Sequence, residues 1–397
     1  MSKDNLRKKI KRSPIKKDTS VLSYDIIFTI LIKVHVESLL RFKSVSKLWN
    51  AMISDNVFTK AHRDQAKALG REKLLIQRKT GEFEFIHLKN INNVTIEKQQ
   101  FPLKGPLPQV LCSYDGLVLL KKPKAYKKFV LWNPSSREHR ILECSYVKPH
   151  EYTFPHAYGL CYDSTTDDYK VILIYSLFYV VYSTSRDSWT KKITPPVLQQ
   201  CLPESEQIPN SRSYVCSQGI GTENRVYWSL NQKFDHNIRK TSAFTYFDVE
   251  SDELKEFPKP ISTGEHEYLF RLSTLKGRLS TYGGNNYFNG LNIWVMKQDG
   301  WNFFMSIRSI PAFNCERFFS NYKLLCCTEN DELIFQGPMY HNLSIYCPKQ
   351  KQFVKTTYIS NHLKYMFSPV DPTCLVSLYF PRLSVTRKRK QRSTPSE

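Results

Sequence analysis

One short pattern of side chains returns at intervals of about 50 residues through most of the chain. In each copy, an aromatic or aliphatic residue is followed by six mostly polar residues and then by a second aromatic or aliphatic residue. The copies begin at Ile76, Trp132, Tyr182, Phe247, Trp294 and Tyr346 and read IQRKTGEF, WNPSSREH, YSTSRDSW, FDVESDEL, WVMKQDGW and YCPKQKQF. This recurrence restricts the fold more than any other feature, because every copy must fit the same local structure.

The pattern is typical of a β-hairpin. In an antiparallel hairpin with a short loop, the two flanking residues can pair across the strands and share one buried face. An interval near 50 residues has room for four strands, which is typical of propeller blades of the kelch kind. We therefore expect residues 70–380 to form an all-β, kelch-like β-propeller of about six blades, with Trp132, Tyr182 and Trp294 buried. The alternative is a run of unrelated hairpins in a β-sandwich.

The segment before the repeats is predicted to be helical. It contains more apolar residues than a module of its size can bury. From Val21 to Phe58, 22 of 38 residues are hydrophobic, and they recur at the three- and four-residue spacing of an α-helix. Ser23 is a candidate N-cap for the first helix. A module of roughly 40 residues rarely stabilises itself without a metal, a disulfide or a partner. No cysteine or metal-ligand cluster lies in this stretch, so residues 21–66 are predicted to bind a partner surface.

This module resembles an F-box. The stretch LSYDIIFTILIKVHVESLLRFKSVSKLWNAMISDNVFTKAH carries SLLRF, VSK, a tryptophan and ISD at the spacing of that family. Ser23 and His35 stand where the family usually has prolines. Ser23 can substitute as a helix cap, whereas the loss of the second proline is expected to loosen the turn after the first helix and to weaken partner binding.

The resemblance implies a partner. An F-box docks through apolar faces on a Skp-family adaptor, which joins it to a cullin-RING ubiquitin ligase. The sequence does not separate positions that contact the adaptor from those that pack inside the module. The positions carried over from the family pattern are Leu22, Asp25, Ile26, Ile30, Leu31, Leu39, Val45, Ser46 and Trp49.

The remainder of the chain resembles the F-box-associated domain of plant F-box proteins, often called F-box/kelch-repeat proteins. The similar stretches are FVLWNPSSREHRIL, YGLCYDSTTDDYKVILI, VYSTSRDSWTKK and IWVMKQDGW. The resemblance implies that this domain captures a protein target for ubiquitylation, in an SCF-type (Skp–cullin–F-box) E3 ubiquitin ligase. The target-contacting residues differ between members of the family, so none can be carried over. The inserted loop at residues 195–213 is the longest candidate for recognition.

The formal net charge of +22 is concentrated near the two ends of the chain. Residues 1–20 and 381–397 are expected to be basic, disordered tails. KKIKR and RKRK are alternatively nuclear-import signals or phosphate-binding segments, and we expect the protein in both nucleus and cytoplasm. A pI of about 9.5 with many aromatics also allows a nucleic-acid-binding propeller without a ligase role. However, the aromatics fall at the blade spacing and are better explained as core.

The sequence gives little sign of an enzyme. GxSxG, GxxxxGK[ST], HExxH and GxGxxG are absent, and no two of the ten histidines are four residues apart. The acidic residues Asp163, Asp167 and Asp168 are expected to stabilise a turn between strands rather than to act in catalysis. We expect no cofactor, no metal and no membrane span, and we expect the cysteines to be reduced thiols.

Overall fold

A computed structural model gives the fold. It describes residues 22–68, 72–77, 83–87, 96–99, 101, 103, 108–122, 125, 127–147, 155–199, 217–222, 224–234, 238–260, 268–285, 290–298, 300–307, 323–328, 330–336, 342–358 and 373–377. The basic tails and most of the loop at residues 195–213 lie outside the described residues, so the expectations about them stay predictions.

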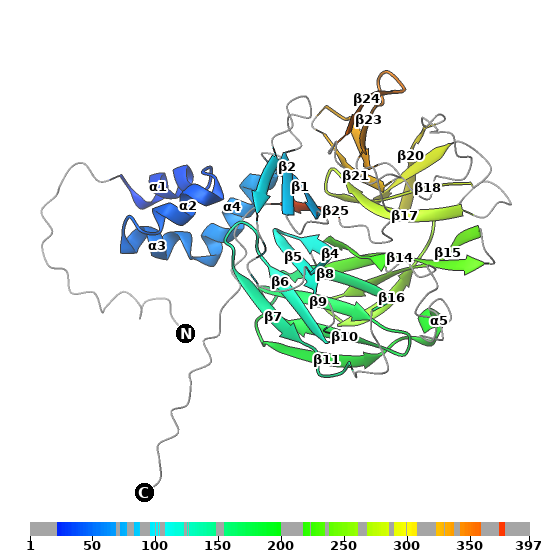
Figure 1. The fold of residues 1–397 in the computed structure, drawn as a ribbon, viewed down its shortest axis with the longest axis horizontal. Helices are drawn as coiled ribbons and strands as arrows, with labels where there is room; N and C mark the ends of the chain where they lie inside the picture. Colours follow the sequence, from blue (N-terminus) through cyan, green and yellow to red (C-terminus); the bar gives the residue numbers. More distant parts are fainter. Residues whose placement is uncertain are drawn as a thin grey trace, which may run out of the picture.

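Four helices come first and stand at one side of the molecule (Figure 1). They are α1 (Tyr24–Leu31), α2 (Val36–Phe42), α3 (Lys47–Ile53) and α4 (Asn56–Ala68). The Ile26 N–H donates to Ser23 Oγ at 3.4 Å, which confirms Ser23 as the cap of α1. His35 caps α2 without a side-chain hydrogen bond. Apolar residues of all four helices form one small core around Leu31 and Leu39.

Within the described residues, six sheets follow and are arranged as the blades of a propeller (Figure 1). Their strands pair antiparallel, except for one short parallel pair in the third sheet. The first sheet contains β1 (Glu72–Gln77), β2 (Phe83–His87), β3 (Ile96–Gln99) and β25 (Thr373–Ser377); the second contains β4 (Gln109–Tyr114), β5 (Leu117–Lys121), β6 (Lys128–Trp132) and β7 (His139–Glu143). The third contains β8 (Ala157–Asp163), β9 (Asp168–Ile174), β10 (Phe178–Ser183), β11 (Ser188–Ile193) and β12 (Ser217–Gln218); the short helix α5 (Pro196–Gln199) follows β11.

The fourth sheet contains β13 (Ile220–Thr222), β14 (Arg225–Phe234), β15 (Ile238–Asp248) and β16 (Glu253–Phe257). The fifth contains β17 (Tyr268–Leu275), β18 (Arg278–Asn285), β19 (Leu291–Lys297) and β20 (Gly300–Ile307); the sixth contains β21 (Lys323–Cys327), β22 (Leu333–Gln336), β23 (Asn342–Cys347) and β24 (Gln352–Tyr358). Neighbouring sheets meet through their inner strands, from β25 and β4 round to β17 and β21. The six sheets confirm the predicted architecture of about six blades.

The two ends of the propeller are joined within one sheet. Strand β25, the last described strand of the chain, pairs antiparallel with β1, with Leu74 opposite Leu375. Strand β25 also contacts β4 of the second sheet. The C-terminal strand therefore completes the sheet that the N-terminal strands begin, and this pairing protects the edge of β1.

The predicted hairpin pairing is confirmed in four of the six copies. Trp132 pairs with His139, Tyr182 with Trp189, Phe247 with Leu254, and Tyr346 with Phe353. In each of these hairpins, the residue five positions after the first partner has a positive φ angle: Arg137, Asp187, Asp252 and Lys351. The constant spacing therefore reflects one repeated turn in which a single residue adopts the left-handed conformation.

The pairing prediction is wrong in the other two copies. Trp294 pairs with Phe303 rather than Trp301, because the strands continue to a tighter turn between Lys297 and Gly300. In the first copy Phe83 pairs with Gln77 rather than Ile76. That hairpin joins the second and third strands of its sheet, since β25 takes the first place, and the repeated turn belongs to the third and fourth strands elsewhere.

The core between the third and fourth sheets depends on a glycine in the YGLCYD stretch. Trp228 is fully buried, and its Nε1 donates to the carbonyl oxygen of Tyr158 at 3.0 Å. A Cβ atom on Gly159 would lie 2.4 Å from Val226 Cγ1 and 2.8 Å from Trp228 Cζ2. Glycine is required here because the β8 backbone lies directly against these two side chains. The predicted burial of Trp132, Tyr182 and Trp294 is also confirmed.

Candidate adaptor-binding and target-binding surfaces

The structure divides the nine positions carried over from the F-box pattern into two groups. Leu31 and Leu39 are buried in the core of the module itself, at 1% and 0% exposure. Trp49 is half-buried, and its ring packs edge-on against Phe42 at 5.5 Å. These positions therefore stabilise the module, and a contact of Leu31 or Leu39 with an adaptor stays a prediction.

The other six positions are exposed to solvent. Leu22, Ile26 and Ile30 are four residues apart, so the last two lie one above the other on α1, with Leu22 just before it. Ile26 and Ile30 are 48% and 51% exposed, which is unusual for isoleucine beside a formed core. Asp25 and Val45 are also exposed, and Ser46 uses its hydroxyl to accept the Trp49 N–H at 3.1 Å.

Three further apolar side chains of this module are exposed although the family pattern did not single them out. They are Tyr24, Leu48 and Val57. Leu48 lies on α3 and fits the helical spacing of this segment. Only the structure shows that the Leu48 side chain is exposed to solvent and is not part of the core.

Helix α4 holds the helical module against the propeller through one buried and one exposed polar contact. The Arg63 guanidinium donates from Nη1 to Asp115 Oδ2 at 3.2 Å and lies over the Tyr162 ring at 5.0 Å. Asp115 is fixed in the tight turn between β4 and β5, where it and Gly116 both have positive φ angles. Asn56 Nδ2 also donates to Asp167 Oδ2 at 2.6 Å. Sequence reasoning missed this contact, because an arginine in a polar helix gives no signal of its partner.

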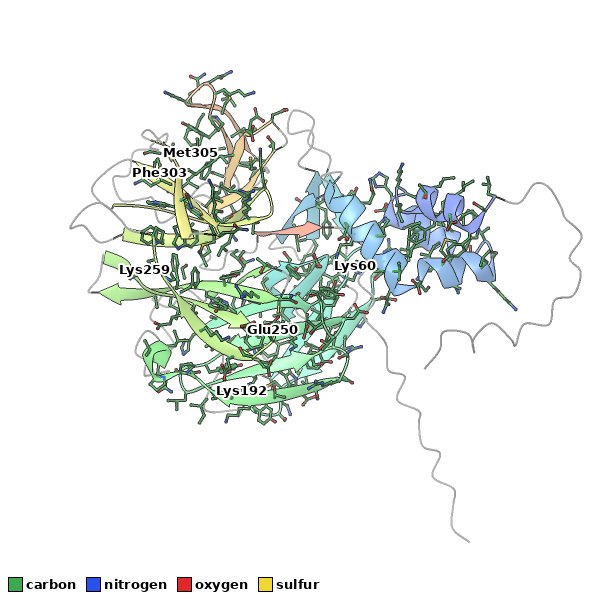
Figure 2. The ribbon with its side chains drawn as sticks, turned by 180° about the vertical axis from the view of Figure 1, so that it is seen from behind. Lys60, Lys192, Glu250, Lys259, Phe303 and Met305 are labelled. Carbon is green, nitrogen blue, oxygen red and sulfur yellow. The ribbon has the colours of Figure 1, made fainter. Side chains whose placement is uncertain are left out.

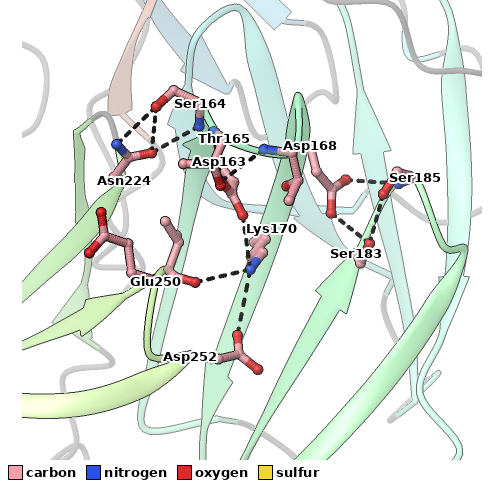
Figure 3. Close-up of polar contacts among 12 residues, drawn as sticks. Asp163, Ser164, Thr165, Asp168, Lys170, Ser183, Ser185, Asn224, Glu250 and Asp252 are labelled. Carbon is pink, nitrogen blue, oxygen red and sulfur yellow. Dashed lines mark hydrogen bonds and ion pairs between the residues drawn. The ribbon is translucent and has the colours of Figure 1, made fainter. Parts of the chain in front are cut away.

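The acidic stretch in YDSTTDDYK forms turn structure, as expected (Figure 3). Asp163 accepts hydrogen bonds from the Thr165 backbone and hydroxyl at 3.0 and 2.6 Å, and it pairs with Lys170 at 3.2 Å. Burial favours a higher pKa for Asp163, but these hydrogen bonds and Lys170 outweigh burial and lower the pKa to about 2. Asp168 accepts from the hydroxyls of Ser183 and Thr184. Each carboxylate is therefore held in a structural role.

The buried ionisable groups of the propeller are also held by packing. Burial lowers the pKa of Lys121 to about 8, and its ammonium lies 4.4 Å from the Phe129 ring centre. Burial raises the pKa of the Cys144 and Cys161 thiols, which reduces their reactivity. Within the described residues, no group of three or more histidine, cysteine or acidic side chains could hold a metal ion. No described helix is long and apolar enough to cross a membrane.

These features define a class of protein, in which a small helical module with exposed apolar side chains is fixed to a six-bladed β-propeller. Residues 83–384 match the F-box associated beta propeller domain, and residues 20–61 match the F-box domain. The chain therefore belongs to the F-box proteins that carry an F-box associated beta propeller domain.

Its curated relatives include plant F-box proteins. The F-box/kelch-repeat protein At3g23880 of Arabidopsis thaliana is 27% identical over 316 residues, which is 74% of this chain and 81% of that protein. The F-box protein CPR1 of Arabidopsis thaliana is 22% identical over 329 residues, which is 75% of this chain and 76% of that protein. Among solved structures, virginiamycin B lyase from Staphylococcus aureus is 16% identical with a TM-score of 0.40, covering 74% of this chain and 82% of that one. So low a score carries no argument about function.

Proposed function

We propose that this chain is the substrate-recognition subunit of an SCF-type E3 ubiquitin ligase. Its F-box docks on a Skp-family adaptor, and through that adaptor on a cullin-RING ligase, while its propeller captures a protein target. In this role the chain supplies binding surfaces and no chemistry of its own, with no cofactor and no metal. Ubiquitin transfer is then carried out by the other subunits of the complex.

The observation that carries this proposal is the exposed row of Leu22, Ile26 and Ile30 on a module of about 40 residues. A surface of this kind in a monomer is typical of a protein interaction site. The adjacent core is already closed around Leu31 and Leu39, so no further fold of the module would bury the row. The module therefore requires a partner with an apolar binding surface, and we infer that this partner is the adaptor.

Adaptor binding by variants of the full chain tests the proposal. Ile26→Ser/Ile30→Ser should reduce binding to a purified Skp-family adaptor by about tenfold or more, since each loss of a buried aliphatic contact costs on the order of 1 kcal/mol. Ile193→Ser is the matched control, because Ile193 is 80% exposed but lies on β11 of the propeller. Both proteins should keep the wild-type thermal transition. Equal adaptor binding by the double variant and the control would contradict the proposal.

A nucleic-acid-binding role remains the competing proposal, because of the basic charge. The two roles differ in their response to salt. Adaptor binding through apolar side chains should change little between low and moderate salt, whereas nucleic-acid binding weakens steeply as counterions compete. Tight, strongly salt-dependent binding of a labelled oligonucleotide, without any adaptor binding, would favour the competing role.

We also propose that the chain is present in nucleus and cytoplasm, with KKIKR and RKRK as import signals. Reporter fusions that lack residues 1–17 and 387–397 should then become more cytoplasmic than the full chain. An unchanged distribution would indicate that both basic runs are solvated charged segments and not import signals.

A further inference from the structure

One side of helix α4 is part of the F-box core. Phe58 and His62 lie on this side and are both 1% exposed. The Phe58 ring packs edge-on against Phe28 of α1 at 5.4 Å, and His62 Nε2 lies 2.9 Å from the carbonyl oxygen of Val34. These contacts join α4 to α1 and to the turn that follows α1, so α4 moves together with the rest of the module.

The opposite side of α4 contacts the propeller at two points. Asn56 and Arg63 lie two helical turns apart on this side, which separates them by about 10 Å along the helix. Asn56 donates to Asp167 in the turn between β8 and β9, and Arg63 donates to Asp115 in the turn between β4 and β5. These turns belong to neighbouring sheets. One contact alone would act as a pivot, whereas two contacts on different sheets fix the orientation of the module. We call these four residues the joint.

The turn between β8 and β9 is itself held in place. Asn224, in the turn between β13 and β14, accepts the Ser164 N–H at 2.8 Å and donates to Ser164 Oγ at 2.9 Å (Figure 3). Asp167 Oδ1 accepts the Tyr162 hydroxyl at 2.6 Å, and this bond orients the carboxylate so that Oδ2 can accept from Asn56. The joint therefore rests on a supported part of the propeller and not on a loose loop.

The proposed adaptor surface and the joint lie on different sides of the helical module. Ile26 and Ile30 are each two residues from Phe28, which is a rotation of about 200° around α1. Phe28 packs against α4, so the two exposed isoleucines face away from α4. Figure 2 shows Lys60, on the propeller side of α4, where the helices meet the strands. An adaptor bound to the isoleucines therefore leaves the joint intact.

We propose that the joint residues Asn56, Arg63, Asp115 and Asp167 are positioning residues of the ligase, which hold the propeller in one orientation relative to the adaptor. This inference rests on the proposed function. The chain supplies no chemistry in that role, so the geometry in which it presents lysines is its means of selecting which lysine receives ubiquitin. A reaction between two held groups is fast only where their distance and orientation are productive. The joint therefore limits transfer to lysines on one part of the propeller and its bound target.

A triple variant of the full chain, Asn56→Ala/Arg63→Met/Asp115→Asn, removes both contacts of the joint. Arg63 and Asp115 are changed together so that neither charge is left buried alone. Asparagine tolerates the positive φ angle of position 115. Asn56→Ala, which removes only the exposed contact, is the milder second variant. Asp64→Ala is the control, because Asp64 is an exposed partner of Arg63 on the same helix. All three should keep a cooperative thermal transition.

Two measurements read out the joint without a known target. Single-molecule fluorescence transfer between dyes at Glu37 on α2 and Thr190 on β11, both exposed, reports the orientation of the module. We expect one narrow distribution in the wild type and a broad one in the triple variant. Self-ubiquitylation by the assembled adaptor, cullin-RING subunits and conjugating enzyme then maps the modified propeller lysines by mass spectrometry. In the triple variant, modification of the lysines preferred in the wild type should fall about tenfold, and other lysines should become modified.

Asn56→Ala should show the same changes to a smaller extent, and Asp64→Ala should match the wild type in both measurements. A narrow distribution in the triple variant would overturn the proposal, because other contacts would then fix the module. The same lysine pattern in the wild type and a loosened variant would also overturn it, while leaving the ligase role in place. If the wild type binds no adaptor, the proposed function fails instead, and the fluorescence measurement still tells whether the joint fixes the orientation.

Discussion

The F-box and the propeller use apolar side chains in opposite ways. In the propeller, large side chains such as Trp132 and Trp228 are buried between sheets that cover one another. In the F-box, Ile26 and Ile30 stay exposed beside a closed core. A repeated architecture can cover its own apolar surface because each blade meets two neighbours. Four short helices cannot, so their remaining apolar surface is available for a partner.

The largest expected effect concerns closure of the propeller. Deleting residues 371–397 removes β25 and exposes the edges of β1 and β4 together. We expect the propeller to lose its cooperative thermal transition rather than to lose one strand locally. Deleting only residues 381–397 is the control and should leave the transition unchanged. A normal transition in the longer deletion, followed by calorimetry, would show that the pairing of β25 with β1 is dispensable.

Breaking the contact between the F-box and the propeller should have the next largest effect on stability. Arg63→Ala leaves Asp115 buried without its cationic partner, which costs about 3–5 kcal/mol when a buried ion pair is broken. Asp64→Ala removes an exposed partner of the same arginine and should cost at most about 1 kcal/mol. Urea denaturation of both variants gives these values. Equal small losses would mean that α4 does not fix the F-box to the propeller.

Inside the propeller, Gly159→Ala tests the close packing of the third and fourth sheets. The added methyl would overlap Val226 and Trp228, and overpacking of this kind costs about 1–3 kcal/mol. Gly290→Ala is the control, because its Cβ would meet only the Ile307 carbonyl oxygen at 3.5 Å. The free energy of unfolding should fall in the first variant and stay within about 0.5 kcal/mol in the second.

The smallest expected effect is on acid stability. The pKa of Asp163 is lowered to about 2 in the folded chain, against about 3.9 in an unfolded one. Its stabilisation is therefore complete above about pH 4 and is lost as the pH falls toward 2. Asp163→Asn should unfold with a shallower pH dependence in that window, as followed by circular dichroism. Glu250→Gln, an exposed neighbour, should keep the wild-type dependence.

The sequence predicted the architecture well because its repeat has a local cause. One left-handed residue per turn, such as Asp187 or Asp252, fixes the spacing of the paired residues, so the spacing can be read without the fold. The hairpin at Trp294 could not be placed, because a tighter turn and the bulge at Phe304 both depend on the neighbouring strand.

The candidate sites were harder to predict than the fold. The helical spacing predicted a helical module, but it joined Phe42 and Val45 to the residues of α3, although Phe42 lies on α2 and Val45 between the two helices. It also could not show that Leu39 is buried and Ile26 is exposed, since both fit the same periodicity. The contact between Arg63 and Asp115 joins residues far apart in the chain, and no pattern in the sequence connects them. Such distant contacts are set by the way the module docks on the propeller.

Hydrogen–deuterium exchange with and without a purified Skp-family adaptor tests the central comparison most directly. If the exposed apolar side chains of the F-box are covered by the adaptor, amides of α1 and α3 should become protected on its addition. The propeller strands, whose large side chains such as Trp132 and Trp228 are already buried between sheets, should exchange at the same rate in both states. Protection confined to propeller strands, or no protection of α1 at a saturating adaptor concentration, would contradict this account.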